Sequence, residues 1–159
     1  MNAIRKILYK IDDQRGSSAV EFAIILPLLV IFVFGIIEFS ILFYNKAMIT
    51  NASREGARKG ILFQDPRVTG PEIENVVNTY SSGRLITFAA GNPDPDTEVY
   101  RNGVLDAVCE NRNDQLTVRV TYPYEFLLLP NFLAIPFFPS GGGLPGTISI
   151  QAITEMRCE

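Results

Sequence analysis

Residues 22–37 read FAIILPLLVIFVFGII and contain no charged side chain. The apolar run continues past Glu38 and Ser40 to Tyr44, which gives a segment of 23 residues. About 20 helical residues cross the hydrocarbon core of a bilayer, so the sequence predicts a membrane-spanning helix over 22–44. The segment is longer than the apolar part of a cleaved secretory signal, and no small-x-small cleavage site follows it. We therefore expect an anchor.

A carboxylate lies at each end of the charge-free run. Glu21 directly precedes it, and an acid at the edge of a bilayer is unfavourable unless a positive group meets it. We therefore treat Glu21 as functional and ask what pairs with it. Glu38 lies near the other membrane surface, where its side chain either reaches water or contacts a neighbouring subunit.

The helix is expected to continue beyond the membrane. Residues 45–59 contain no proline, and two basic residues at their end suit the negative end of a helix dipole. Glu55 and Lys59 stand four residues apart in the order that favours an ion pair. Gly60 is typical of the residue that follows a helix. We predict one long helix over 17–60, half of it in lipid and half projecting.

Residues 61–159 have the pattern of a small α+β domain. A proline followed by an acid begins a helical pattern over 71–80, whose apolar residues share one face. Alternation of apolar and polar residues over 116–122 is the clearest strand pattern in the chain, and Asn102-Gly103 predicts a hairpin turn. Further strands are expected over 84–90 and 147–156, in a mostly antiparallel sheet.

The stretch 126–139 does not fit this pattern. It is apolar, contains three prolines and is followed by a serine and three glycines. The prolines exclude a second spanning helix and a central strand. Two alternatives remain: the stretch folds over the sheet as core, or it is an exposed patch that contacts a partner or a membrane.

The composition excludes several classes of function. The chain has 159 residues, a net charge of −3 and no histidine. It lacks the basic patch of a nucleic-acid-binding protein, and it has no glycine-rich phosphate loop or nucleophile motif. We expect no enzymatic activity, no cofactor, no metal site, no small-molecule substrate and no nucleic-acid partner.

Cys109 and Cys158 are the two cysteines of the chain and are too few for a zinc site. Their separation suits a single disulfide that closes a long loop, if the domain lies in an oxidising compartment. The alternative is a pair of reduced, partly buried thiols.

Three segments together resemble a known family. Residues 15–22, RGSSAVEF, resemble the class III signal of type IV pilin-like proteins. Residues 52–58, ASREGAR, and 156–159, MRCE, look like the TadE-like pseudopilins of the tight adherence (Flp) pilus apparatus. Phe22 stands where major pilins more often carry tyrosine, which favours a minor component.

The resemblance implies cleavage by a prepilin peptidase between Gly16 and Ser17. Glu21 then becomes the fifth residue of the mature chain, and the new amine of Ser17 meets Glu21 of a neighbouring subunit. Two alternatives stay open. The amine and the acid are four residues apart and share a face of one helix, or the acid is solvated and has no partner.

The resemblance also orients the chain. Four basic residues precede the span and four follow it closely, so charge alone gives no orientation. A TadE-like protein of the bacterial inner membrane would have a cytoplasmic leader over 1–16 and a periplasmic domain over 61–159, in which the Cys109–Cys158 bridge is expected. On the projecting helix Arg54, Glu55 and Arg58 would form an interaction surface for lipid phosphates or an acidic subunit; the two arginines alternatively only complete the helix end.

Two functions are therefore weighed. The first is a processed minor pseudopilin, whose partners are inner-membrane lipid, the prepilin peptidase, other pilin-like subunits and the assembly platform. The second is a permanently anchored single-span protein whose outer domain is a scaffold or a ligand-binding module. The two differ in the fate of the bond between Gly16 and Ser17.

Overall fold

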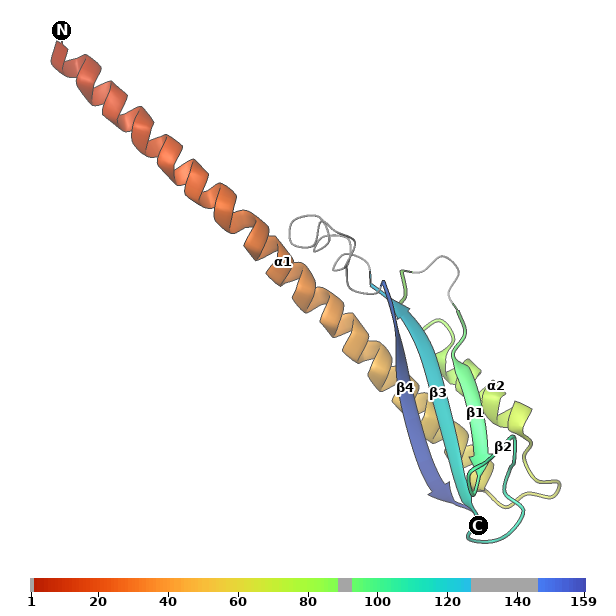
Figure 1. Ribbon diagram of the computed structural model, residues 1–159. Coiled ribbons are helices and arrows are strands. Elements are labelled where there is room, and N and C mark those ends of the chain that lie inside the picture. The colour runs from red at the N-terminus through yellow and green to blue at the C-terminus, as the bar shows by residue number, and fades with distance from the viewer. Residues whose placement is uncertain (1, 89–92, 127–145) are drawn as a thin grey trace. The chain divides into compact units, whose positions relative to one another are not determined.

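The structure is a computed structural model that describes residues 2–88, 93–126 and 146–159. The chain divides into two compact units, Met1–Ile37 and Glu38–Glu159. In chain order the elements are α1 (Asn2–Ile61), α2 (Gly70–Ser81), β1 (Asp96–Arg101), β2 (Val104–Leu105), β3 (Gln115–Glu125) and β4 (Thr147–Arg157) (Figure 1). This element order confirms the predicted α+β class, with a long N-terminal helix before a small sheet.

Helix α1 exceeds the predicted helix over 17–60 at both ends. It begins at Asn2 because residues 2–16 contain no proline, and the single Gly16 disfavours a helix by only about 1 kcal/mol. The expectation that Gly60 follows the helix is wrong, since Gly60 is helical and buried. A Cβ atom at Gly60 would lie 2.6 Å from Cδ2 of Leu116. The glycine therefore serves close packing.

Helix α2 confirms the pattern predicted over 71–80. Its first turn contains Pro71, and Ile73 and Val77 are buried on one face. The carboxylate of Glu72 accepts hydrogen bonds from the backbone N–H of Thr69 (2.7 Å) and from the Thr69 hydroxyl (2.9 Å). These bonds fix the residue at which the helix begins.

The described strands form one antiparallel sheet in the order β2-β1-β3-β4. The predicted hairpin turn at Asn102-Gly103 joins β1 to β2, and both residues have positive φ angles (48° and 82°), as a two-residue turn requires. The strands expected over 116–122 and 147–156 are confirmed by β3 and β4.

The strand predicted over 84–90 is wrong where the structure describes it. Residues 85–88 have no regular secondary structure, and residues 89 and 90 lie outside the described part of the chain. The backbone N–H and C=O of Ile86 bond to the side chain of Asn45 instead of to a neighbouring strand. Of the apolar stretch 126–139, only Phe126 is described; it is half-buried against Tyr124.

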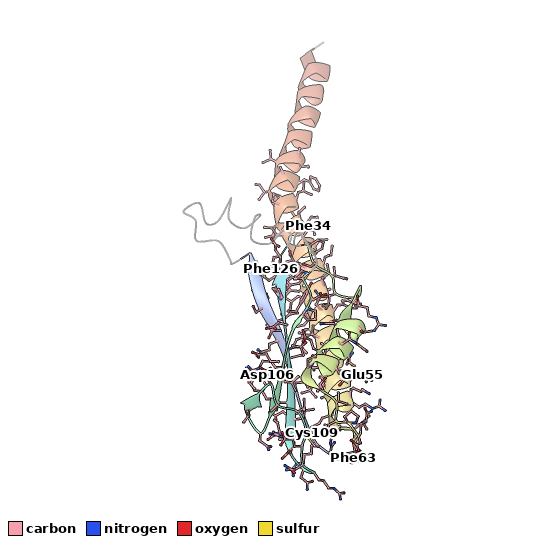
Figure 2. All side chains as sticks on the ribbon, turned by 90° about the vertical axis from the view of Figure 1, so that its right-hand side faces the viewer. Phe34, Glu55, Phe63, Asp106, Cys109 and Phe126 are labelled. Atoms are coloured by element: carbon pink, nitrogen blue, oxygen red, sulfur yellow. A yellow bond between two sulfur atoms is a disulfide. The ribbon has the colours of Figure 1, made fainter. Side chains whose placement is uncertain are left out.

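The core of the second unit lies between one face of the sheet and the helices. Its side chains come from α1, α2 and alternate positions of the strands, namely Ile49, Ala52, Ala57, Ile73, Val77, Val99, Leu116, Val118, Val120, Tyr122, Tyr124, Ile150 and Ala152. Helix α1 runs antiparallel to β3: Glu38 contacts Tyr124, and Gly60 lies against Leu116. Figure 2 accordingly shows Phe126 at one end of the sheet and Cys109 at the other.

Candidate functional site

The first half of α1 has an apolar surface on all of its sides. Between Val20 and Tyr44 most large apolar side chains are exposed, by amounts from 41% at Leu26 to 71% at Ile24. The half-buried exceptions are Val30, Ile31, Ile41 and Leu42. Within the described residues, α1 is the one helix long and apolar enough to cross a membrane. A helix of this kind is stable only when lipid or other helices cover it.

Gly16, Ser17, Glu21 and Phe22 lie together along one exposed stretch of this helix. No atom of the described chain lies within 4 Å of where a Cβ would stand on Gly16, so intramolecular packing does not require a glycine there. Among the described residues the ion pairs are Arg101–Glu110 and Arg119–Glu98, and Glu21 takes part in neither. The expected functional acid therefore has no basic partner within the described part of its own chain.

One of the two outcomes predicted for Glu38 is wrong, and the other, contact with a neighbouring subunit, stays a prediction. Its side chain is only 3% exposed and lies in the second unit, where the Tyr124 hydroxyl donates to the Glu38 backbone carbonyl at 3.5 Å. The prediction of a side chain that reaches water at a membrane surface is thus wrong. Burial, and secondarily the charge of Glu38, raises the pKa of Tyr124 to about 12, so that the phenol keeps its proton at neutral pH.

Arg54, Glu55 and Arg58 are exposed on the side of α1 that faces away from the core. Their neighbours Ser53 and Ala57 are fully buried. The predicted ion pair between Glu55 and Lys59 does not form; Lys59 Nζ lies 3.4 Å from the side-chain oxygen of Gln64. The structure thus presents two arginines and a glutamate to solvent on one stretch of helix.

Asn45 is a site residue that the sequence analysis missed. It is fully buried; its Nδ2 donates to the Ile86 carbonyl (2.6 Å), and its Oδ1 accepts from the Ile86 N–H (2.9 Å). A side-chain amide that hydrogen-bonds to both the N–H and the C=O of one residue takes the place of the two hydrogen bonds that a neighbouring strand would make. The sequence feature that could have revealed it is its spacing: Asn45 lies four residues before the buried Ile49 and therefore on the same face of α1, which packs against the core.

The two cysteines are joined in a disulfide. Cys109 and Cys158 have Cα atoms 5.8 Å apart, and both residues are buried. The bridge ties the segment after β2 to the residue that follows β4, where the Cys158 N–H also donates to the Asp114 carbonyl at 2.9 Å. Among the described residues no group of acidic, histidine or cysteine side chains is arranged to hold a metal ion.

Comparison with known proteins finds a family match. The family model described as TadE-like protein matches residues 16–58, which confirms the resemblance over that segment. No curated protein and no solved structure matches the chain. The match begins at Gly16 and ends at Arg58, so it includes the apolar helix, Glu21 and the exposed charged residues of α1.

Proposed function

We propose that this chain is a TadE-like minor pseudopilin, a membrane-anchored structural component in the assembly of the tight adherence (Flp) pilus apparatus. One observation carries the proposal: the family match begins at Gly16, the residue after which a prepilin peptidase would cut. The match leaves out residues 1–15, which belong to the predicted leader over 1–16.

The exposed apolar helix supports this proposal. Its side chains have no cover within the first unit, and lipid before assembly, then neighbouring pilin-like helices, would supply it. Its apolar stretch over 22–44 is long enough for a single span. In the proposed topology residues 1–16 face the cytoplasm and the domain over 61–159 faces the periplasm, an oxidising compartment in which a disulfide persists.

Cleavage would create the missing partner for Glu21. Hydrolysis of the peptide bond between Gly16 and Ser17 consumes one water, leaves a carboxylate on Gly16 and frees an ammonium group on Ser17. The ordinary pKa of such an amine is about 7.7–8.0, so it is mostly protonated at neutral pH. Two helices offset by a few residues would bring this amine to Glu21 of the next subunit. A buried pair of this kind fixes register more reliably than it adds stability.

Arg54, Glu55 and Arg58 would supply a second contact in this assembly. They are exposed and have no ion-pair partner among the described residues. Arginine side chains bind carboxylates and phosphates through paired N–H donors. We assign this surface to an acidic neighbouring subunit or to the assembly platform at the membrane.

The mass of the native protein tests processing. The protein is purified from cells with and without the prepilin peptidase, and its intact mass is measured. We expect the mature mass to lack residues 1–16 only in cells that have the enzyme. A full-length mass in peptidase-positive cells would contradict the proposal and favour a permanently anchored scaffold.

Glu21→Ala tests the pairing. We expect normal cleavage but loss of assembly, because the amine of the neighbouring Ser17 has no acid to meet. Cross-linking of subunits and recovery of the protein in sheared surface fractions measure the effect. Glu74→Ala is the control, since Glu74 is an exposed acid on α2 without an ion pair in the described structure. Normal assembly of the Glu21 variant would show that the pairing account is wrong.

A further inference from the structure

The second unit exposes apolar side chains at the end where Tyr124 meets α1. On α1 these are Phe39, Phe43 and Tyr44, exposed by 51%, 67% and 43%. After α2 they are Ile86 and Phe88, each exposed by 41%. We call these five residues the collar. They come from two segments more than 40 residues apart in the sequence, which the hydrogen bonds between Asn45 and Ile86 hold together.

We call the two hydrogen bonds between the Asn45 side chain and the Ile86 backbone the Asn45 clamp. Because both backbone groups of Ile86 bond to the Asn45 side chain, Ile86 lies beside α1 at the height of residue 45. Leu85 is buried, whereas Ile86 and Phe88 are exposed. The segment that follows α2 rises toward the end of the sheet at which β3 ends (Figure 1). The clamp therefore holds Ile86 close to the level of Tyr44.

The polarity of α1 changes at the same height. The exposed large apolar side chains end at Tyr44, and the next residues on the helix are Asn45 and the exposed Lys46. Lys46 Nζ donates to the backbone carbonyl of Gln151 on β4, so the lysine ammonium group lies against the sheet. Aromatic side chains followed by a lysine are typical of the boundary between the hydrocarbon core and the head groups.

We infer that the collar is a lipid-contacting surface. Its side chains lie in the interfacial layer of the bilayer that α1 crosses, so the folded domain rests on the membrane. Continuity with the apolar helix favours lipid over a second protein copy. Phe39, Phe43 and Tyr44 continue the exposed apolar side chains of residues 22–37, with Glu38 buried and Ser40 the exposed polar residue between them. The inference rests on the membrane anchoring in the proposed function.

The chain allows a clean measurement because it has no tryptophan. Single reporters are introduced into the full-length protein as Phe88→Trp in the collar, Phe34→Trp in the apolar helix and Val104→Trp at the distal hairpin, where Val104 is 60% exposed. Each variant is reconstituted into phosphatidylcholine vesicles whose acyl chains carry bromine either near the head group or near the bilayer centre. A zwitterionic lipid is chosen because Asp94 and Asp96, which follow the collar segment in the sequence, are exposed.

We expect three different quenching profiles. The Phe34→Trp reporter loses most of its fluorescence with deep bromine, the Phe88→Trp reporter with shallow bromine, and the Val104→Trp reporter with neither. Formation of the Cys109–Cys158 disulfide checks the fold of each variant, and Ile86→Trp replaces Phe88→Trp if that variant fails the check.

The outcomes separate this inference from the proposed function. Quenching of the Phe34→Trp reporter without quenching in the collar would overturn the inference and leave the anchor in place. Absence of quenching at both positions would overturn the anchor as well. A collar reporter that is blue-shifted but insensitive to bromine, in protein that cross-links between copies, would assign the surface to a second copy and likewise overturn the inference.

Discussion

At the scale of single residues, the interaction that most shapes the second unit is the one between Asn45 and Ile86. A buried amide on the packed face of a helix is unfavourable unless its donors and acceptor are satisfied. Here the backbone of Ile86 satisfies them with two hydrogen bonds of 2.6 and 2.9 Å. The pair holds an irregular segment against α1 without help from a neighbouring strand.

Asn45→Ala is therefore expected to destabilise the domain by about 1–3 kcal/mol, because it leaves two backbone groups of Ile86 without partners. Thermal unfolding of the full-length protein in detergent, followed by the near-ultraviolet circular dichroism of the core tyrosines, measures the change. Asn51→Ala is the matched control, since Asn51 is exposed on the same helix. Equal effects of the two substitutions would contradict this role for Asn45.

At the scale of elements, α1 and α2 approach each other closely because α1 has glycine at the contact. A Cβ at Gly56 would lie 2.7 Å from Cγ2 of Val77 and 3.4 Å from Cγ2 of Ile73. Both neighbours are fully buried and branched at Cβ, so they have little freedom to move aside. Gly56 is therefore tolerated for packing, despite the poor helix propensity of glycine.

Gly56→Ala tests this close approach. Alanine favours the helix by about 1 kcal/mol, but overpacking a tight core costs about 1–3 kcal/mol. We expect a net loss of stability and a lower Tm in the same unfolding experiment. Gly35→Ala adds the same methyl group where no atom lies within 4 Å, and it should leave the Tm of the domain unchanged. A Gly56 variant as stable as the parent would show that the helices have room to separate.

The cap of α2 makes the domain sensitive to acid. The hydrogen bond from the Thr69 backbone N–H lowers the pKa of Glu72 below its ordinary value of 4.5. The unfolded chain therefore binds this proton more tightly, so the stabilisation is complete well above pH 4.5 and is lost as the pH falls through the lower pKa of the folded state. The backbone N–H of Asn111 lowers the pKa of Asp114 in the same way.

We expect Glu72→Gln to reduce the fall in Tm between about pH 6 and pH 3, because the variant has no carboxylate to protonate at the cap. Asp114 still titrates, so part of the pH dependence should remain. Glu74→Gln removes an exposed acid from the same helix without touching the cap and serves as the control. Identical pH dependence in the two variants would contradict a role for the cap in acid stability.

At the scale of the whole molecule, the two ends of the second unit are secured by different means. The Asn45 clamp and the contact between Tyr124 and Glu38 hold one end. The Cys109–Cys158 bridge closes the other, and it links residues 49 positions apart in the sequence. A cross-link over such a loop stabilises the fold mainly by restricting the unfolded chain.

Replacing both cysteines by serine should lower the stability of the domain by up to about 4 kcal/mol, the chain-entropy value for a loop of this size. Thermal unfolding with and without a reductant measures it. The parent should lose stability when reduced, whereas the double variant should not respond to the reductant. A parent protein indifferent to reduction would show that the bridge adds little to the folded state.

Local patterns in the sequence predicted much of this molecule. The apolar helix, the turn at Asn102-Gly103 and the alternation along β3 each depend on neighbouring residues alone, and the structure confirms them. The family resemblance could be recognised for the same reason, since the residues around Glu21 form one continuous segment. The candidate processing site was thus within reach of the sequence.

Long-range packing decided the rest. Gly60 was predicted to follow the helix, but it lies inside it, where a Cβ would stand 2.6 Å from Leu116 and 2.7 Å from Ile73. Residues 85–88 have the composition of a strand and are not one, because an amide 41 residues earlier in the chain takes up the hydrogen bonds of Ile86. Glu38 stands in an apolar run, yet the fold buries it beside Tyr124. Periodicity shows which face of an element is apolar; only the tertiary structure shows which distant group that face meets.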